Sequence, residues 1–300
     1  MLSSWRNNNQ LNNPLTIGQA RQWLADQLPA SQGQQQSIMW LLSFILASPA
    51  SQIIAQPERR LSLPQWRRLQ KAATKLANGY PLAYLTGQQD FYDRTFAVSP
   101  AVLIPRPESE CLIDIIKQLR SSFNQPTAWL DIGTGSGCLI ISAALELTND
   151  DYFGGSDISR SALKMAQRNG SALKAKINWR AGSLLRPWLK NDWQQYQQLV
   201  IIANLPYVKP EIYQQTKAEL RHEPKKALLS GHDGLKLFRR LAKELPTFIA
   251  NHPNCTIHLI TESDLGQVTI LQNMLTVGGL QWQKSFPDLT GRQRFNWWHN

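Results

Sequence analysis

The stretch Leu130-Asp131-Ile132-Gly133-Thr134-Gly135-Ser136-Gly137 decides the fold class of this 300-residue chain. It completes an apolar run at residues 128–132, typical of a buried strand, and precedes an apolar segment at 138–147 that predicts a helix. Glycine lets the backbone adopt positive φ and approach a ligand closely. A glycine-rich turn between strand and helix is typical of the carboxyl edge where open α/β sheets bind ligands.

Strand and helix patterns continue to alternate after this turn. Further strands are predicted at residues 152–156, 199–203 and 256–261, and further helices at 161–169 and 235–245. Such alternation favours a mostly parallel sheet covered by helices on both faces. We therefore predict a Rossmann-like α/β domain.

The spacing of the glycines and two acidic residues indicate the ligand. The pattern is Gly-x-Gly-x-Gly, whereas dinucleotide enzymes use Gly-x-Gly-x-x-Gly. Asp131 suits a cationic amino-acid ligand better than a pyrophosphate. Asp157 ends the next strand and can accept both hydroxyls of a ribose, with capping of the following helix as the alternative. Together these features favour S-adenosylmethionine over NAD. The predicted cofactor-binding residues are Gly133, Thr134, Gly135, Ser136, Gly137 and Asp157.

A second motif, Asn204-Leu205-Pro206-Tyr207, ends the buried strand at 199–203. Asn and Pro alone would be ordinary turn chemistry. After a sheet strand of a methyltransferase domain, the Asn side-chain oxygen and the carbonyl of the next residue can accept the two N–H bonds of an NH2 group. The Tyr ring can stack on the flat group that carries this NH2. We predict these four residues as the catalytic and substrate-binding loop, with Asn204 also bordering the cofactor.

This loop suits a weak nitrogen nucleophile. Accepting both N–H groups favours the positive charge that develops on the nitrogen as it attacks a methyl group. Alkylation acidifies the nitrogen, so its proton can leave without a dedicated base, and in-line positioning supplies the rest of the rate. No metal or side-chain nucleophile is required, which excludes most hydrolytic functions. The NH2 can belong to a protein amide or to a nucleic-acid base.

The first eighty residues show helical periodicity and almost no strand pattern, with helices predicted at 16–28, 34–47 and 64–78. The apolar run at 38–47 is half the roughly 20 residues of a membrane span, so we predict a buried helix. Turn residues between 80 and 107 predict a hairpin. The predicted domains are a helical domain at 1–80, a hairpin linker at 81–107 and the α/β domain at 108–300.

The formal net charge of +11 indicates attraction to nucleic acid or to acidic assemblies. Arg67, Lys71 and Lys75 recur every four residues on one face of a predicted helix. A solvated face is favoured there, and a weak RNA or ribosome contact stays open.

The three cysteines stand singly, which argues against a disulfide framework or a zinc site. We expect a cytoplasmic protein without metal or membrane segment.

Further ordered blocks run along the chain between about residues 35 and 298. They comprise residues 81–87 with 90–92, Leu103-Ile-Pro105-Arg106-Pro107-Glu108-Ser-Glu110, 223–228, 231–235, 262–267 and 288–294. In these blocks and in the two motifs above, the chain resembles the PrmC/HemK protein-(glutamine-N5) methyltransferases, which act on peptide-chain release factors.

The resemblance implies a class I S-adenosylmethionine-dependent methyltransferase domain preceded by a hairpin linker and by a small helical domain that docks the release factor. It implies methylation of the glutamine in the release factor's Gly-Gly-Gln loop. By position, residues 133–137 and Asp157 hold the cofactor, and residues 204–207 hold the glutamine. The blocks at 262–267 and 288–294 are expected in the closing strands.

The chain departs from the family's pattern at two positions, and a third segment predicts a domain junction. The family's usual tetrapeptide is Asn-Pro-Pro-Tyr, so Leu205 can serve if only its carbonyl takes part, in a less rigid loop. Leu185 stands where many relatives have an aromatic beside the adenine, which leaves Trp188 or simple apolar packing to fill that role. Two prolines around Arg106 predict a rigid domain junction, with Glu108 as the partner of the arginine.

The motifs leave alternative functions open. A related enzyme methylates a glutamine of a ribosomal protein with the same loop, and only the N-terminal domain can separate the two substrates. An adenine N6-methyltransferase would present the same exocyclic NH2 after base flipping, although no separate target-recognition domain is visible. A non-enzymatic cofactor-binding scaffold is the third alternative, because of Leu205.

Overall fold

The computed structural model describes residues 14–30, 33–147, 150–191, 193–216 and 218–300. Contacts within the chain divide it into two compact units, residues 1–87 with 217–222, and residues 88–216 with 223–300. Residues 1–13 of the predicted helical domain lie outside the described residues. The domain boundaries that we placed after residues 80 and 107 stay predictions.

The first unit is helical, and its three longest helices lie where the sequence predicts them. Its helices are α1 (Ile17–Gln27), α2 (Gln34–Leu46), α3 (Ala50–Ala55), α4 (Leu63–Ala77) and α5 (Leu82–Thr86). Thr16 and Ser62 each begin a helix with a capping box, which satisfies backbone N–H groups of the first turn. Apolar faces of α1, α2 and α4 share one core that includes Leu24, Leu41 and Leu69.

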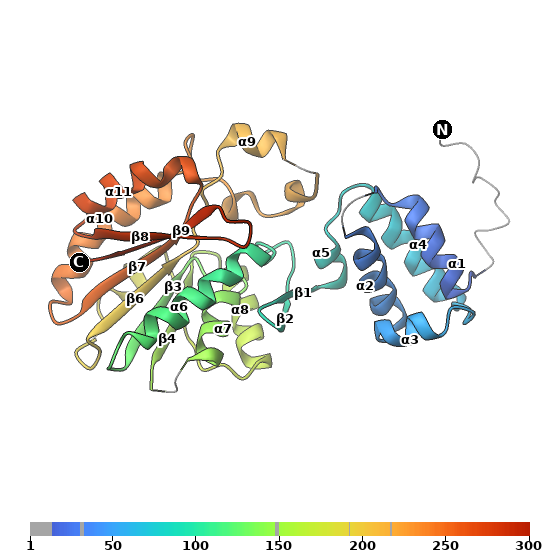
Figure 1. Cartoon of the computed structure of the whole chain (residues 1–300), viewed down its shortest axis with the longest axis horizontal. Coiled ribbons are helices and arrows are strands. Elements are labelled where there is room, and N and C mark those ends of the chain that lie inside the picture. Colours follow the sequence, from blue (N-terminus) through green and yellow to red (C-terminus); the bar gives the residue numbers. More distant parts are fainter. Residues whose placement is uncertain (1–13, 31–32, 148–149, 192, 217) are drawn as a thin grey trace. The chain divides into compact units, whose positions relative to one another are not determined.

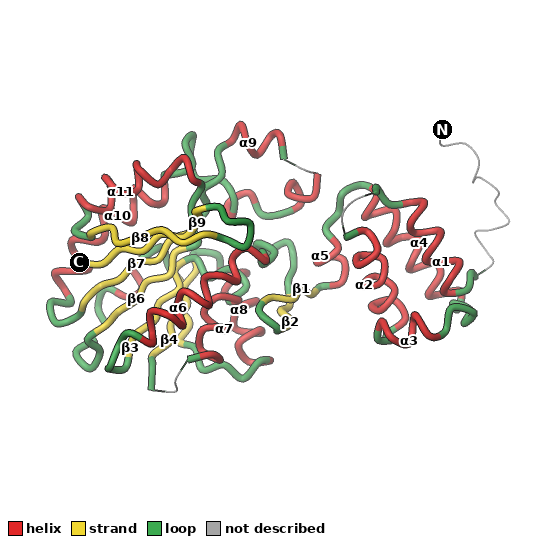
Figure 2. Tube along the Cα trace, viewed as in Figure 1, coloured by secondary structure: helices red, strands yellow, loops and turns green. Residues whose placement is uncertain are grey.

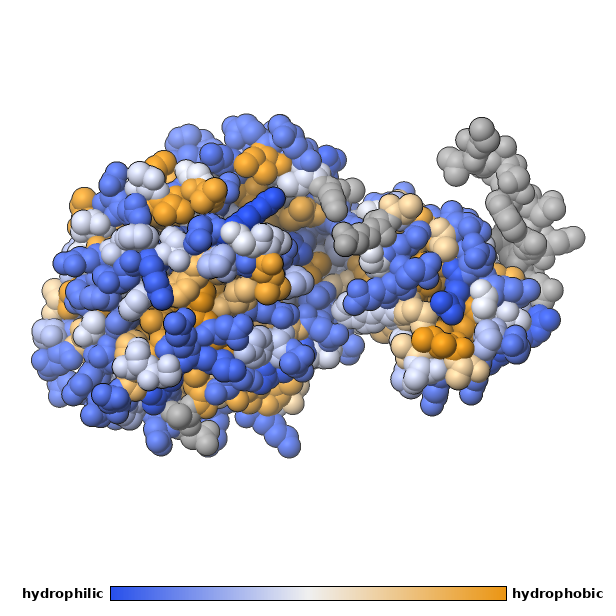
Figure 3. Space-filling view, viewed as in Figure 1, coloured by the Kyte–Doolittle hydropathy of each residue, from blue (hydrophilic) through white to orange (hydrophobic). Residues whose placement is uncertain are grey.

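The surface of the helical unit carries the basic residues of α4. Arg67, Lys71 and Lys75 are exposed, on the side of the helix away from the buried Leu69. Exposed Phe44 and Ile54 belong to α2 and α3, and Figure 3 shows hydrophobic residues gathered on this unit's visible face. Within the described residues, the structure contains no helix with the length and apolar character of a membrane span.

A β-hairpin lies within the segment predicted to contain one. Strands β1 (Gln88–Phe91) and β2 (Arg94–Ala97) pair in antiparallel register. Tyr92 and Asp93 form the two-residue turn, and both have left-handed φ values, 49° and 57°. Those values match the tight turns that suit the twist of a hairpin.

The second unit contains a seven-stranded sheet in the order β5-β4-β3-β6-β7-β9-β8 (Figure 1). Its strands are β3 (Thr127–Ile132), β4 (Tyr152–Asp157), β5 (Asn178–Ala181), β6 (Gln198–Ala203), β7 (Thr256–Glu262), β8 (Gln281–Pro287) and β9 (Gln293–His299). The strands from β5 to β7 are parallel, and β9 pairs antiparallel with both of its neighbours. The mostly parallel sheet confirms the predicted fold class.

Helices cover both faces of this sheet (Figure 2). The helices of the unit are α6 (Cys111–Ser121), α7 (Cys138–Glu146), α8 (Arg160–Ala172), α9 (Pro210–Gln215), α10 (Lys236–Asn251) and α11 (Val268–Val277). Single 3-10 turns occur at Pro107–Glu110, Arg186–Trp188, Ala218–His222, Lys225–Ala227 and Leu265–Gln267. Successive residues of β3 alternate between the two cores, so Trp129 packs with α6 and α7 while Leu130 packs with α10.

The last two of the ordered blocks are mostly loops, which corrects our expectation of closing strands. Strand β7 ends at Glu262, and the following residues enter a 3-10 turn. Residues 288–292 form the turn between β8 and β9, where the Asp288 N–H donates to the Arg292 carbonyl at 2.8 Å. Asp288 and Gly291 are turn-forming residues, so the local sequence favours this turn and the expectation of a strand at 288–292 is wrong.

Asp151, at the amino edge of the sheet, gives a test of the fold. Its buried carboxylate accepts hydrogen bonds from Arg120 (2.7 Å), the Thr127 N–H (2.9 Å) and the Trp129 indole (3.2 Å). Asp151→Asn keeps the shape but loses the charge that faces Arg120. We expect the free energy of unfolding to fall by about 2 kcal/mol, measured by urea denaturation. An unchanged unfolding midpoint would show that this carboxylate does not hold α6 to the sheet.

Candidate active site

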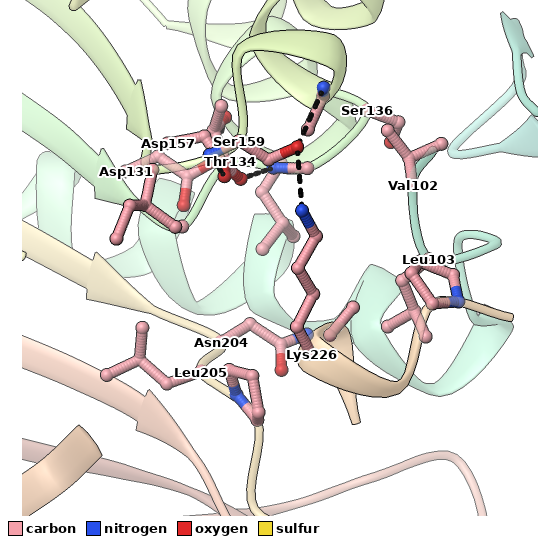
Figure 4. Close-up of a pocket in the computed structure, with 18 of the residues that line it drawn as sticks. Val102, Leu103, Asp131, Thr134, Ser136, Asp157, Ser159, Asn204, Leu205 and Lys226 are labelled. Atoms are coloured by element: carbon pink, nitrogen blue, oxygen red, sulfur yellow. Dashed lines mark hydrogen bonds between the residues drawn. The ribbon is translucent and has the colours of Figure 1, made fainter. Parts of the chain in front are cut away.

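A pocket opens in the second unit at the carboxyl ends of β3, β4 and β6 (Figure 4). The residues of both sequence motifs meet there, although the two motifs lie far apart in the sequence. The predicted site residues that line it are Gly133, Thr134, Gly135, Ser136, Asp157, Asn204, Leu205 and Pro206. Gly137 and Tyr207 do not line the pocket and lie beside it.

The glycine-rich turn folds over the end of β4. Gly133, Gly135 and Gly137 all have left-handed φ, between 57° and 82°. The Gly133 N–H donates to the Ser156 carbonyl at 2.8 Å, which fastens the turn to β4. Gly137 begins α7, where a Cβ atom would lie 2.9 Å from the Ile141 side chain. This third glycine therefore serves helix packing, while the first two border the pocket.

Two acidic side chains lie inside the pocket. Asp131 is 1% exposed, and its Oδ2 accepts a hydrogen bond from the Thr134 hydroxyl at 2.6 Å. Burial raises the pKa of Asp131 to about 7, the Thr134 hydrogen bond opposes this rise, and the nearby charge of Asp157 adds to it. A buried carboxylate with a raised pKa gains most from a cationic partner.

Asp157 holds the turn and faces the pocket. Its Oδ2 accepts the Gly135 N–H at 3.0 Å, and its Oδ1 accepts the Ser159 N–H at 2.7 Å. Burial raises the pKa of Asp157, and these two backbone hydrogen bonds oppose the rise. Ser159, not Asp157, caps α8, because its hydroxyl accepts the Ala162 N–H. The alternative role of Asp157 as the helix cap is therefore wrong.

The apolar wall of the pocket is formed by aliphatic side chains. Leu185 and Trp188 are fully buried in the core, and the Trp188 indole donates to the Ser156 hydroxyl at 3.1 Å. Neither residue lines the pocket, so Trp188 does not fill the role suggested for it. Ile158 and Leu184 line it instead. Leu184 has a φ of 52°, a left-handed value that nothing in its sequence context indicates.

Residues 204–207, the predicted substrate-binding segment that we call the acceptor loop, begin directly after β6. The Asn204 side-chain Nδ2 donates to Glu262 Oε2 at 2.9 Å, and the Tyr207 hydroxyl donates to Glu262 Oε1 at 2.8 Å. The Leu205 side chain is 3% exposed and packs in the core against the turn at Gly133. Burial of the side chain is consistent with a contribution from the main chain alone at this position.

Glu262 is a buried partner of this loop that sequence reasoning did not single out. It is 4% exposed and also accepts a hydrogen bond from the Ser109 hydroxyl at 2.7 Å. The Arg294 guanidinium lies 4.0 Å from its Oε1. Burial raises the pKa of Glu262, and the donors around it oppose that rise. The sequence feature that could have drawn attention to Glu262 was its place at the start of the block 262–267.

Two further blocks hold the backbone after Pro206. The Gln267 side chain donates to the Tyr207 and Asp233 carbonyls, both at 3.0 Å. Gly234 has a φ of 79°, and a Cβ atom there would lie 2.0 Å from the Tyr207 carbonyl oxygen. Only glycine fits so close to this backbone. Blocks 231–235 and 262–267 thus fix the position of Tyr207.

Arg106 forms another wall of the pocket. Its guanidinium pairs with Glu223, whose other oxygen accepts the Ile104 N–H at 3.0 Å. The expected pair between Arg106 and Glu108 is therefore wrong. Glu223 is distant in sequence but buried, and it holds the segment around Arg106 at two points, the Ile104 N–H and the Arg106 guanidinium. The prolines on either side of Arg106 keep this segment extended.

Comparison with known proteins gives two family matches. Residues 19–87 match the PrmC N-terminal domain, and residues 111–231 match the family model described as ribosomal protein L11 methyltransferase (PrmA). The first match covers the helical unit, and the second covers the part of the chain that contains both motifs. The two matches therefore lie in different parts of the chain.

Similar proteins match over most of their length and carry one name, release factor glutamine methyltransferase. The protein from Neisseria gonorrhoeae is 34% identical, covering 76% of this chain and 80% of its own. That from Koribacter versatilis is 35% identical, over 68% and 71%. That from Bacillus subtilis is 30% identical, over 77% and 80%. With both motifs in one pocket, these matches establish that the chain belongs to the release factor glutamine methyltransferase family.

Proposed function

We propose that this protein transfers a methyl group from S-adenosylmethionine to the side-chain amide nitrogen, N5, of the glutamine in the Gly-Gly-Gln motif of peptide-chain release factors. The observation that carries the proposal is that Asn204, Leu205 and Pro206 line the same pocket as the two buried carboxylates and the glycine turn. The names of the similar proteins favour a release factor over a ribosomal protein or an adenine base. The helical unit is proposed to dock the release factor.

The residues of the pocket fit S-adenosylmethionine. Asp131 suits the amino group of the methionine part, since a cation would stabilise its buried charge. Asp157 suits the ribose hydroxyls, and Ile158 with Leu184 supplies apolar surface for a flat base. When bound, the cofactor supplies a methyl group on a positively charged sulfur. Ile158 and Leu184 fit the expected alternative of simple apolar packing beside the adenine.

The acceptor loop supplies the hydrogen-bond acceptors for the substrate amide. Asn204 uses its Nδ2 toward Glu262, which leaves Oδ1 to accept one N–H of the glutamine. The Leu205 carbonyl accepts the other N–H. Together they favour the nitrogen as it becomes positively charged, and the proton leaves after alkylation has acidified it. The Tyr207 ring, held through its hydroxyl by Glu262, stacks on the flat amide.

Methylation of a purified release factor tests the proposed function. We expect the protein and S-adenosylmethionine to add one methyl group to the Gly-Gly-Gln peptide, located by tandem mass spectrometry. A release factor with this glutamine replaced by alanine is the control and should remain unmodified. Equal methylation of the altered factor would overturn the assignment, and modification of a ribosomal protein alone would support the alternative substrate.

Substitution of Asn204 tests the acceptor loop. Asn204→Ala removes an acceptor that is needed as charge develops, so kcat should fall by about 100-fold or more. Affinity for S-adenosylmethionine should stay within about threefold, because Asp131 and Asp157 remain. Single-turnover methylation gives the first quantity and isothermal titration the second. A collapse of cofactor affinity with little change in kcat would assign Asn204 to cofactor binding instead.

The raised pKa of Asp131 predicts a pH dependence of cofactor binding. A cationic ligand prefers the ionised carboxylate, which predominates above the pKa of about 7 and is lost as the pH falls through it. Affinity for S-adenosylmethionine should therefore be full near pH 8 and fall by about tenfold toward pH 6. Titration calorimetry across this range measures it. Asp131→Asn should bind weakly with a flatter profile, and an equally steep profile in this variant would point to Asp157.

A further inference from the structure

We propose that Glu262 is a positioning residue that fixes which way round the Asn204 carboxamide lies. It keeps Asn204 Nδ2 on its own side and thereby presents Asn204 Oδ1 to the substrate nitrogen. This inference rests on the proposed function and assigns to Glu262 a role that depends on its charge and its lack of a proton donor. Glu262 itself does not line the pocket.

The pairing of two neighbouring strands brings these side chains together. Strands β6 and β7 are parallel, and Ala203 lies opposite Thr261 in their register. Asn204 and Glu262 are the next residues along each strand. Paired parallel strands lie about 4.8 Å apart, so side chains at matching positions reach each other at the carboxyl edge. The Asn204 Nδ2 to Glu262 Oε2 distance is 2.9 Å.

The chemistry of the two groups determines the orientation. A carboxamide has a donor end and an acceptor end of nearly the same shape, so packing alone distinguishes them poorly. An ionised carboxylate only accepts hydrogen bonds. Rotation of the Asn204 amide by half a turn would set its oxygen against Glu262 Oε2. A charge-assisted hydrogen bond favours the observed orientation by roughly 10- to 100-fold.

Ser109 strengthens this preference. Its hydroxyl donates to Glu262 Oε2 at 2.7 Å, so its lone pairs are directed elsewhere. The Asn204 Nδ2 also lies 3.4 Å from the Ser109 oxygen, on the same side as Glu262 Oε2. One N–H of the Asn204 amide is therefore directed at these two oxygens. A reversed amide would lose both interactions. It would also direct its own N–H groups at the N–H groups of the substrate.

Burial raises the pKa of Glu262, and the hydrogen-bond donors around its carboxylate oppose that rise. Hydroxyl groups of Ser109 and Tyr207 donate to it, and Arg294 lies 4.0 Å away. Arg294 is in turn held by Asp288, whose Oδ2 accepts its Nε–H at 2.9 Å. Glu108 is the like charge that acts on the same carboxylate. Burial and Glu108 oppose ionisation, whereas the hydroxyls and the arginine support it.

Exchange of donor and acceptor between the two residues tests the role directly. Glu262→Gln introduces a donor and should lower kcat by about 10-fold or more with unchanged cofactor affinity. Asn204→Asp should also lower kcat, because two carboxylates then face each other. In the double variant N204D/E262Q, the amide introduced at position 262 can donate to the carboxylate introduced at position 204, whose second oxygen faces the substrate. Its kcat should exceed the product of the two single effects by about 10-fold.

Asp151→Asn is the matched control, because it neutralises another buried carboxylate at the opposite edge of the sheet. It should lower stability but leave kcat within about twofold. A double variant no better than the product of the single effects would overturn the inference. If Glu262→Gln alone does not fold, the kcat values of N204D and N204D/E262Q are compared. A higher kcat in the double variant supports the positioning role, and an equal or lower kcat overturns it.

A measurement without turnover separates this inference from the proposed function. In protein labelled with ¹⁵N-asparagine, the Asn204 side-chain NH2 signals, assigned by their loss in Asn204→Asp, should shift in Glu262→Gln and not in Asp151→Asn. Absence of release-factor methylation by the unaltered protein would overturn the proposed function, while these signals still report the contact. Unmoved signals, or normal kcat in Glu262→Gln, would overturn the positioning role alone.

Discussion

Parallel pairing of four neighbouring strands is the constraint on which the rest of this protein depends. In the order β4-β3-β6-β7, each strand ends at the same edge of the sheet. Each end supplies one polar side chain to the site, and these are Asp157, Asp131, Asn204 and Glu262. Chemistry from four distant parts of the sequence is therefore placed within one region by main-chain hydrogen bonds alone.

These strand ends divide into two pairs with different partners. Asp131 and Asp157 belong to the glycine turn, and burial raises the pKa of both. That shift reflects a cost in stability, which a cationic ligand with hydroxyl groups would relieve. Asn204 and Glu262 already satisfy each other. Under the proposed function, the first pair recognises the cofactor, and the second holds one acceptor atom in place for the substrate.

Loops from outside these strands hold the remaining walls. Glu223 fastens the segment around Arg106, and Gln267 fastens the backbone of Tyr207. Gly234 allows another loop to approach that same backbone closely. Leu205 joins the core instead of stiffening its loop as a proline would. Leu205 lacks the ring constraint of a proline, and these neighbours hold the backbone that follows it.

The sequence alone was sufficient for features that depend on local pattern. Periodicity and glycine spacing located β3, α7 and the three main helices of the first unit, and the motifs at 130–137 and 204–207 pointed to the pocket. The Asn204 motif could not reveal its partner, because Glu262 is 58 positions away and looks like an ordinary strand end. The same limit explains the wrong partner for Arg106, because Glu223 is also distant in sequence. Local sequence determined which groups are present, whereas strand register and burial decided which of them meet, since hydrogen bonds between distant residues form only once the chain has folded.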